Sequence, residues 1–325
     1  MEYEVLHETD IKISRIGIGS WALGGPNWKE GRSEGWSKIN RADALEALSF
    51  AVDNGITHFD SADIYGNGEA ERLLAQGIGS ASTTVTLSSK VGWFRGTAPH
   101  AYEAGHIRSQ CEQSLRNLQR DYLDIYYLHH SDFGKDDQYL DEAVEVMQRL
   151  KDEGKIRAIG FSTYTYKAFS KYIPYIQPAV VQGWAHLLDY HFIARNSPLL
   201  NLCEKYHCNF IGYQPFDQGI LLDKYSPDMI PAFEDGDHRG ESYKFQKSYL
   251  DKAQKGLQQS GEEFGTSLKN RVSTAIRFVL SHKGVTGTLA GFRNKKQVEM
   301  LLQNDILIPF KGGELARLYQ AFKGE

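Results

Sequence analysis

Long hydrophobic runs are missing from this chain of 325 residues. Its longest apolar stretches have the length of a β-strand, whereas a transmembrane helix needs about 20 consecutive apolar residues. The first five residues, MEYEV, are acidic and lack the basic and then apolar layout of a signal peptide. We therefore expect no membrane-spanning segment and a cytoplasmic location.

Cysteine and excess positive charge are also scarce. The chain has three cysteines, Cys111, Cys203 and Cys208, which is an odd number. Cys203 and Cys208 are close in sequence, but a metal site would need a second pair of cysteines. We interpret them as reduced thiols, and we expect no metal centre. The formal net charge is −4 and no dense run of lysine or arginine occurs. Nothing in the composition therefore indicates a nucleic acid or an anionic membrane as partner.

Strand-like and helix-like patterns alternate along most of the chain. Short apolar or β-branched runs predict eight strands, at 16–19, 58–60, 85–90, 124–129, 158–162, 179–182, 210–213 and 287–290. Helical periodicity lies between them, at 42–54, 69–78, 106–118, 140–153, 166–172, 197–206, 267–282 and 295–303. Eight successive β/α units predict an α/β fold of the (β/α)8 TIM barrel type, in a single domain covering residues 1–325.

Three segments lie outside this repeat. Residues 3–5 and 11–13 flank a turn and predict a small N-terminal β-hairpin. The segment 217–266, a long loop after the seventh strand, is rich in glycine and charge and contains a predicted helix at 249–259. Loops of more than about 15 residues are usually functional lids or disordered, and a position over the barrel mouth favours a lid. Residues 315–322 predict an extra C-terminal helix.

Four polar side chains fall near the carboxyl ends of three successive strands, where TIM barrels place their functional residues. Tyr65 can donate a proton, and the ammonium of Lys90 would stabilise its phenolate and lower the pKa of the tyrosine. Asp60 can pair with Lys90, and His129 can orient a substrate oxygen. Taken singly, Asp60 could be a helix cap, Lys90 a solvated charge and His129 a structural histidine. Their coincidence at one end of the barrel favours acid catalysis on a carbonyl group.

A short glycine motif suggests a second fold. The residues GIGSWA at 17–22 match the G-x-G-x-x-A fingerprint of a doubly wound, dinucleotide-binding sheet. That fold expects an acidic residue about 20 positions further on, whereas the second strand ends only at Asp60. Trp21 is also a poor start for a helix that holds phosphate. We therefore favour the barrel.

On such a barrel, the chain resembles the aldo-keto reductase superfamily over nearly its whole length. It is most similar to the bacterial general-stress and inositol-associated reductases and to potassium-channel β subunits. The matching stretches follow the family's order, at 14–21 (SRIGIGSW), 59–66 (FDSADIYG), 121–129 (DYLDIYYLH), 154–162 (GKIRAIGFS), 219–225 (GILLDKY) and 291–293 (GFR). The resemblance implies reduction of an aldehyde or ketone, sugar-derived ones included, with hydride from NADP(H) and a proton from Tyr65. The alternative is a cofactor-binding regulatory or assembly module in which turnover is incidental.

The resemblance also implies an extended NADP(H) laid across the strand ends. At the nicotinamide end, Ser162 and Gln182 match the residues that hold the carboxamide, and Tyr213 matches the aromatic side chain that stacks under the ring. At the other end, Arg293 matches the arginine that binds phosphate near the adenosine. The remaining residues implied to bind the cofactor, most of them around the pyrophosphate, are Thr163, Phe216, Gly219, Leu221, Lys224, Arg239, Gly291 and Gln297. A glycine-bearing loop suits the pyrophosphate because it offers free N–H groups.

Several positions depart from the family pattern. They are Thr163 in place of asparagine, Ala185-His186 in place of Tyr-Asn, Gln214 in place of serine, and Met300-Leu301 in place of Glu-Asn near the adenine. A preference for NADP(H) therefore rests on Arg293, with Lys295 and Lys296 close in sequence, and NAD(H) is the alternative cofactor. The two lysines could instead be solvated surface charges.

Four residues that follow strand ends are expected to line the substrate pocket: Trp21, Trp93, Phe94 and His130. Aromatic side chains beside one or two polar groups suit either an aryl aldehyde or the face of a sugar. For Phe94, packing under the lid is the competing interpretation. We expect a small-molecule partner, and the sequence leaves the physiological substrate and the oligomeric state open.

Overall fold

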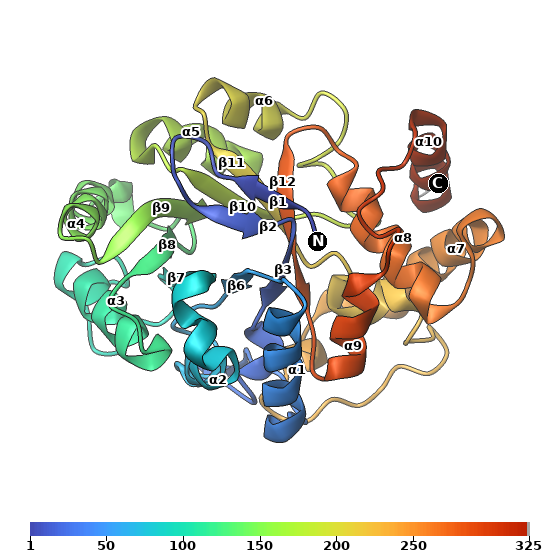
Figure 1. Ribbon diagram of the computed structural model, residues 1–325, viewed down its shortest axis with the longest axis horizontal. Helices are drawn as coiled ribbons and strands as arrows, with labels where there is room; N and C mark the ends of the chain where they lie inside the picture. Colours follow the sequence, from blue (N-terminus) through green and yellow to red (C-terminus); the bar gives the residue numbers. More distant parts are fainter. Residues whose placement is uncertain (324–325) are drawn as a thin grey trace.

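A closed barrel of eight parallel strands forms the centre of the structure (Figure 1). The computed structural model describes residues 1–323. In chain order the barrel strands are β3 (Ile16–Gly19), β6 (His58–Asp60), β7 (Thr86–Val91), β8 (Leu123–Leu128), β9 (Ile156–Ser162), β10 (Val180–Trp184), β11 (Asn209–Tyr213) and β12 (Val285–Gly291). β12 pairs with β3 and closes the ring. The predicted TIM barrel is thus confirmed, with small differences at the strand ends.

Helices alternate with these strands and surround them (Figure 1). They are α1 (Arg41–Asp53), α2 (Glu69–Ile78), α3 (Ala104–Leu118), α4 (Leu140–Asp152), α5 (Tyr166–Ile176), α6 (Pro198–Lys205), α8 (Leu268–Leu280) and α9 (Lys295–Glu299). The main difference from expectation is α5, which continues through Pro174 until Gln177 ends it in the left-handed conformation. Within residues 1–323, no helix has the length and apolarity needed to cross a membrane.

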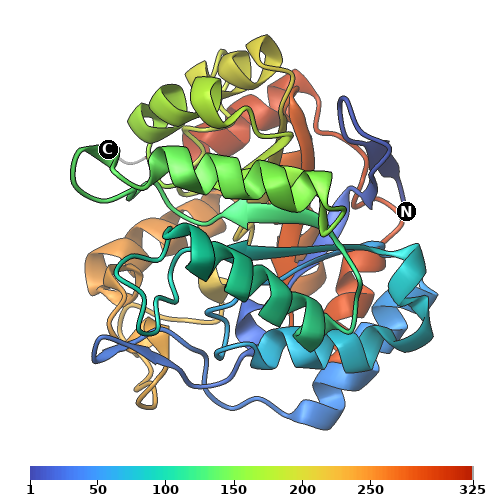
Figure 2. The same cartoon turned by 90° about the vertical axis from the view of Figure 1, so that its left-hand side faces the viewer.

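The predicted N-terminal hairpin closes one end of the barrel. β1 (Tyr3–Val5) pairs with β2 (Lys12–Ser14), and Leu6, Ile11 and Ile13 pack in one buried cluster with the barrel residues Tyr127 and Ile211. Because apolar side chains fill this end, a ligand has to enter from the other one. Figure 2 shows the hairpin at the N-terminus on one side of the molecule and the long segment after β11 on the opposite side.

Two segments cover the open, carboxyl end of the barrel. One is residues 217–266, here called the lid, which contains α7 (Lys247–Phe264) and packs against the C-terminal helix α10 (Gly312–Phe322). The other is residues 24–38, here called the front segment, with the short strands β4 (Trp28–Lys29) and β5 (Arg32–Ser33), which the sequence patterns do not predict. The front segment is fixed to the lid, since the backbone N–H groups of Asn27 and Gly35 both donate to the carbonyl of Gly236, each at 3.1 Å.

The glycine motif at 17–22 serves packing inside the barrel. A Cβ atom on Gly17 would lie 2.8 Å from Nδ1 of His58 and 2.9 Å from a methyl group of Leu289. Glycine therefore lets β3 approach its neighbours. The motif has no phosphate-binding helix after it, because Trp21 begins only a three-residue 3-10 helix. The closed barrel excludes the doubly wound sheet.

Candidate active site

The four candidate catalytic residues meet in one large cavity at the carboxyl end of the barrel, with a volume of about 1040 Å³. Asp60 and Lys90 are buried and form an ion pair, and Nζ of Lys90 also donates to the carbonyl of Ser61 at 2.6 Å. The centroid of the Tyr65 ring lies 5.1 Å from Nζ of Lys90 and 5.9 Å from the centroid of the His129 ring. Strands β6, β7 and β8 thus bring together residues that are up to 69 positions apart in sequence (129 − 60).

Asp60 connects the two sides of the barrel. Its Oδ1 accepts hydrogen bonds from Oγ of Ser88 at 2.6 Å and from Nε2 of Gln182 at 2.9 Å, while Oδ2 faces Lys90. It caps none of the helices in residues 1–323, so the interpretation as a helix cap is wrong. A carboxylate with three partners in a buried site holds each of them in a defined place. Asp60 therefore positions the ammonium group of Lys90 beside Tyr65.

The pKa of Tyr65 differs from the expectation. Burial raises it well above the ordinary value of 10.0, and the negative charge of Asp60 raises it further. The expected net lowering of the pKa is not found, because burial outweighs the stabilisation that the nearby ammonium of Lys90 gives to a phenolate. Burial also lowers the pKa of Lys90, against the charge of Asp60. Tyr65 therefore keeps its proton until negative charge develops on a bound substrate.

His129 is a neutral imidazole at neutral pH. Burial lowers its pKa well below 6.5, and the charge of Lys90 lowers it further. Its Nδ1 atom is buried and has no hydrogen-bond partner among the described residues. A neutral ring can donate one hydrogen bond and accept another. Together with the phenol of Tyr65, it provides two hydrogen-bonding groups for one substrate oxygen.

The residues expected around a nicotinamide ring lie beside this site, with one exception. Ser162, Gln182 and Tyr213 all line the cavity. Thr163 does not: it is buried, and its hydroxyl donates to Oγ of Ser131 at 2.8 Å. The reason is that Ser162 ends β9, and neighbouring side chains along an extended chain point in opposite directions. Thr163 is therefore no candidate for contact with the cofactor.

Three cationic side chains gather at the far end of the cavity: Lys224, Arg239 and Arg293. Loss of hydration lowers the pKa of Lys224, and the charges of Arg293 and Arg239 lower it further. Nη2 of Arg293 is buried without a hydrogen-bond partner in residues 1–323. Unpaired buried donors cost about 1–3 kcal/mol each. The cluster thus fits an anion such as a phosphate group.

Arg239 already has partners of its own. Its guanidinium donates to both carboxylate oxygens of Asp237, at 2.9 and 2.7 Å, and to the hydroxyl of Tyr225 at 3.0 Å. Arg239 is therefore held within the lid without a bound phosphate. Lys224 and Arg293 are therefore the cations of this cluster that a phosphate group would pair with.

The loop after β11 departs from the expected pyrophosphate clamp in two places. The N–H groups of Gly219 and Leu221 both donate to the carbonyl of Phe216, at 2.9 and 3.2 Å, so they are not free. Leu221 is buried and does not line the cavity, whereas Phe216 and Gly219 do. The turn is tight because Asp217, Gln218 and Gly219 have consecutive positive φ angles of 44°, 58° and 90°.

The remaining positions near the adenosine end divide between cavity and surface. Gly291 and Gln297 line the cavity, and Oε1 of Gln297 accepts from the backbone N–H of Arg293 at 2.7 Å. Lys296 also lines it. Lys295 instead pairs with Glu46 at the surface, at 3.3 Å. Met300 and Leu301, which depart from the family pattern, both line the cavity and make this part of its wall apolar.

Two of the four expected substrate residues line the cavity, namely Trp21 and Trp93. His130 does not: its Nε2 is hydrogen-bonded to the carbonyl of Gly92 at 2.7 Å, and its ring lies under Trp93. Phe94 stacks on His106 instead. Phe94 thus packs on α3 and neither lines the cavity nor is seen to pack under the lid, and the expectation that His130 lines the cavity is wrong.

The sequence patterns missed several side chains that line the cavity. These are Lys29, Glu34, Trp36, Tyr164, Trp184, His238 and Lys244. His186 and Gln214, which depart from the family pattern, line it too. Most come from loops, where periodicity carries no information. The signal that could have found some of them is tryptophan, since four of the five tryptophans in the chain line this cavity.

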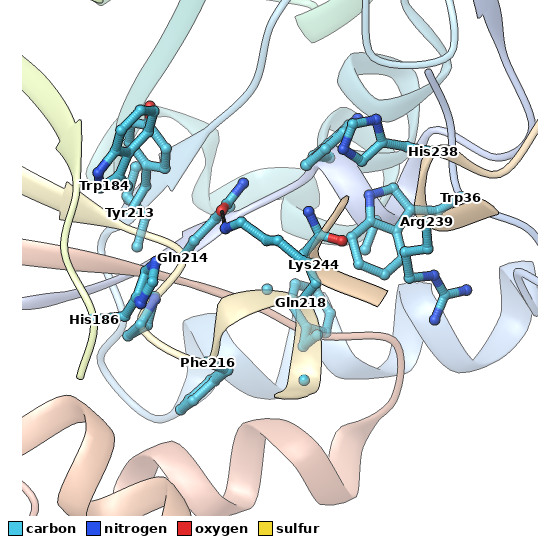
Figure 3. A pocket seen from close by; sticks show the side chains of 18 of the residues that line it. Trp36, Trp184, His186, Tyr213, Gln214, Phe216, Gln218, His238, Arg239 and Lys244 are labelled. Atoms are coloured by element: carbon cyan, nitrogen blue, oxygen red, sulfur yellow. Dashed lines mark hydrogen bonds between the residues drawn. The ribbon is translucent and has the colours of Figure 1, made fainter. Parts of the chain in front are cut away.

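A buried network holds the lid against the barrel. Lys244 forms an ion pair with the fully buried Asp217 and donates to Oε1 of Gln214 at 3.3 Å. Asp217 also accepts from the hydroxyl of Tyr249 at 2.6 Å and lies 3.6 Å from Nε2 of His186. Figure 3 shows Lys244 extended across the cavity toward Gln214. Two positions that depart from the family pattern, His186 and Gln214, are thus joined through Asp217 and Lys244.

Comparison with known proteins agrees with the fold. A model described as the Aldo/keto reductase family matches residues 15–318. The chain is 29% identical over 309 residues to the aldo-keto reductase YhdN of Bacillus subtilis, covering 93% of this chain and 88% of that protein. It is 26% identical over 306 residues to the L-galactose dehydrogenase of Arabidopsis thaliana, covering 92% and 86% of the two chains.

A solved structure gives the same answer for the fold. The holo form of the aldo-keto reductase AKR11C1 from Bacillus halodurans superposes with a TM-score of 0.77 and 22% identity, covering 99% of this chain and 97% of that one. The family model extends from the first barrel strand, β3, into the C-terminal helix α10. The resemblance found in the sequence is confirmed, and the chain belongs to the aldo/keto reductase family of oxidoreductases.

Proposed function

We propose that this protein is an NADP(H)-dependent oxidoreductase that reduces an aldehyde or a ketone to an alcohol. The observation that carries the proposal is the position of Tyr65, a protonated phenol beside the Asp60–Lys90 pair and His129. The bound nicotinamide supplies the hydride. Tyr65 gives its proton to the carbonyl oxygen, and the ammonium of Lys90 stabilises the phenolate that forms.

The far end of the cavity supports a phosphate-bearing cofactor. Lys224, Arg239 and Arg293 would hold its phosphates, and the unpaired Nη2 of Arg293 gives a specific donor for one of them. Tyr213 would stack on the nicotinamide ring. Gln182 would have to share its amide between the carboxamide and Asp60, since its Nε2 already donates to that carboxylate.

The substrate is a small carbonyl compound, and sugar-derived carbonyls are the candidates that we favour. The tryptophans along the cavity provide flat walls, which suit the face of a sugar ring or chain. The similarity to an L-galactose dehydrogenase supports the same class. A regulatory module with incidental turnover is the competing function, and the assembled group around Tyr65 favours the enzyme because binding alone has no use for a proton donor.

Oxidation of NADPH with a panel of aldehydes and ketones tests the proposal. We expect clear turnover by the wild type and a loss of about 100-fold or more in kcat for Tyr65→Phe, since only the proton donor is removed. Cofactor affinity should stay nearly unchanged in this variant. Near-normal turnover by Tyr65→Phe would show that Tyr65 is not the proton donor. Tight NADPH binding without turnover of any carbonyl would favour the binding module.

A further inference from the structure

Lys29 and Glu34 place two charged groups at the mouth of the cavity. Lys29 ends β4 and Glu34 follows β5, and both side chains line the cavity together with Tyr65 and His129. Both residues are half-buried. They lie on the front segment, far in sequence from the barrel residues around Tyr65, so no part of the proposed proton transfer uses them.

The backbone that carries Glu34 is fixed to the catalytic end of the cavity. Nε1 of Trp21 donates to the carbonyl of Glu34 at 3.0 Å, and the Trp21 ring stacks on Tyr65 with centroids 6.1 Å apart. The neighbouring residue, Ser33, is held by the lid, because its N–H donates to Oε1 of Glu241 at 3.0 Å. Glu34 thus has a defined position relative to the proton donor.

Lys29 is placed in a similar way. Its Nζ lies 4.0 Å from the centroid of the Trp93 ring, and Trp93 lies 6.4 Å from His129. Burial, the charge of Lys90 and that of His130 lower the pKa of His129, and the charge of Lys29 acts in the same direction. Trp93 thus connects the ammonium group of Lys29 to His129.

Apart from the contact of Lys29 with the Trp93 ring, neither charged group has a hydrogen-bonded or ionic partner among residues 1–323. Among residues 1–323, the ammonium of Lys29 and the carboxylate of Glu34 make no hydrogen bond and no ion pair, with each other or with any other side chain. Burial lowers the pKa of Lys29 and raises that of Glu34, so each ion is less well solvated than in water. Partly desolvated charges are normally paired. Two such charged groups that face a cavity without a hydrogen bond or an ion pair indicate a site where a ligand supplies the missing hydrogen bonds.

The combination of an ammonium and a carboxylate restricts the ligand. Lysine only donates hydrogen bonds and an ionised carboxylate only accepts them. An anionic substrate would be repelled by Glu34, and a cationic one by Lys29. A hydroxyl group both donates and accepts, so neighbouring hydroxyls on a neutral molecule can satisfy both side chains.

We propose that Lys29 and Glu34 form a hydroxyl-binding subsite, and that the substrate is a polyhydroxylated aldehyde or ketone. This inference rests on the proposed carbonyl reduction and specifies its substrate. The walls of the cavity fit it, since Trp21, Trp36 and Trp93 offer apolar faces for the C–H groups of such a chain. The carbonyl group lies at Tyr65 and the hydroxyl groups point toward the front segment.

Matched aldehydes test the subsite. Each pair has the same number of carbons with and without hydroxyl groups: D-glyceraldehyde against propanal, and D-erythrose against butanal. For the wild type, kcat/KM with NADPH should be at least 10-fold higher for the hydroxylated member. Glu34→Gln and Lys29→Met should each lower this value about 10-fold or more for the hydroxylated aldehydes, mainly through KM, and less than 2-fold for the others.

Control variants come from the same segment. Glu30→Gln and Lys38→Met remove the same kinds of charge from exposed positions outside the cavity lining. In both pairs of aldehydes, they should leave the ratio of kcat/KM for the hydroxylated member to kcat/KM for the other member unchanged. An equal loss for both members of each pair in Glu34→Gln and Lys29→Met would overturn the subsite. So would a wild type that reduces propanal as well as glyceraldehyde.

A binding measurement separates this proposal from the proposed reaction. Titration of tryptophan fluorescence with erythritol and with 1-butanol needs no turnover, and four tryptophans line the cavity. We expect erythritol to bind and Glu34→Gln to weaken it about 10-fold. If no aldehyde is reduced but erythritol binding still depends on Glu34, the reaction is wrong and the subsite stands. If aldehydes are reduced but neither measurement depends on Glu34, the subsite is wrong.

Discussion

The guanidinium carbon of Arg239 lies 4.5 Å from the centroid of the Trp36 ring, and that of Arg293 lies 5.4 Å from the same ring. One indole from the front segment thus holds two cations that would otherwise repel each other. Trp36 also meets Trp21 edge-on at 5.5 Å, and Trp21 stacks on Tyr65. Figure 3 shows Trp36 and Arg239 together at one side of the cavity. Trp36 therefore links the phosphate end of the cavity to the catalytic end.

Replacement of Trp36 by leucine should weaken NADPH binding. A cation–π contact contributes about 0.5–2 kcal/mol, so loss of two should lower affinity on the order of 10-fold. Trp36→Phe keeps an aromatic face and should lose less. Calorimetric titration of NADPH into both variants measures the difference, and circular dichroism checks that they fold. Equal affinity in Trp36→Leu and the wild type would show that the two arginines need no aromatic support.

Asp237 should control whether the front segment and the lid open together. It is buried, and its Oδ2 accepts from the backbone N–H of Ser37 at 2.9 Å and from the Ser37 hydroxyl at 2.7 Å. Removal of one partner from a buried charged group costs about 3–5 kcal/mol. In Asp237→Asn we therefore expect faster hydrogen exchange in both 24–38 and 217–266, and slower exchange again when NADPH is added.

A surface pair between the same two segments provides the control. Glu234 lies 3.4 Å from Lys38, and both side chains are exposed. Exposed pairs contribute at most about 1 kcal/mol, so Glu234→Gln should leave hydrogen exchange nearly unchanged. Faster exchange in the lid alone for Asp237→Asn would mean that the two segments move independently.

Three buried histidines should make the protein unstable in mild acid. Burial lowers the pKa of His58, His130 and His186 to about 4, from an ordinary value of 6.5. Between these values the unfolded chain binds more protons than the folded one, so the free energy of unfolding falls as the pH drops from about 6.5 to 4. Each histidine that stays neutral contributes up to about 3 kcal/mol to this loss.

Urea unfolding at a series of pH values between 7.5 and 4.5 measures the effect. His186→Gln removes one titrating group and should flatten the decline, although the loss of its contact with Asp217 lowers stability at neutral pH. His7→Gln removes an exposed histidine instead and should leave the slope as in the wild type. A wild-type stability that does not change across this range would contradict the neutral state of the three rings.

The barrel and the residues around Tyr65 could be predicted because both follow from regular patterns. Parallel strands buried on both faces are short apolar runs, and the barrel places all their carboxyl ends at one side. Asp60, Lys90 and His129 had to meet once their strands were assigned. At a strand end, neighbouring residues face opposite sides, so an error of one position in the predicted end changes which side chain faces the cavity. Ser162 lines the cavity, whereas Thr163 does not.

The front segment could not be predicted from pattern. β4 and β5 have two residues each, too few for any periodicity, and they exist because Gly236 and Asp237 of the lid accept hydrogen bonds from this segment. The pKa of Tyr65 could not be predicted either. It depends on how strongly burial acts compared with the nearby charges of Asp60 and Lys90. Only the structure shows that the ammonium of Lys90 forms an ion pair with Asp60.

Arg293 should decide between NADP and NAD. Its Nη2 has no partner among the described residues and its guanidinium lines the far end of the cavity. The 2′-phosphate is the one charged group that distinguishes the two cofactors. A charged hydrogen bond to it contributes about 1.5–3 kcal/mol, which is about 10- to 150-fold in affinity. Arg293→Ala should therefore weaken NADPH by this factor and leave NADH nearly unchanged.

Fluorescence titration of both cofactors, with the wild type and with Arg293→Ala, gives the four dissociation constants needed. The difference between wild type and variant should shrink as salt is added, because partly exposed ion pairs are screened over about 8–10 Å. Lys295→Ala is the matched control, since this neighbouring cation pairs with Glu46 at the surface. Equal losses for NADPH and NADH would place Arg293 at the pyrophosphate. Tighter binding of NADH by the wild type would show that the apolar wall of Met300 and Leu301 outweighs the arginine.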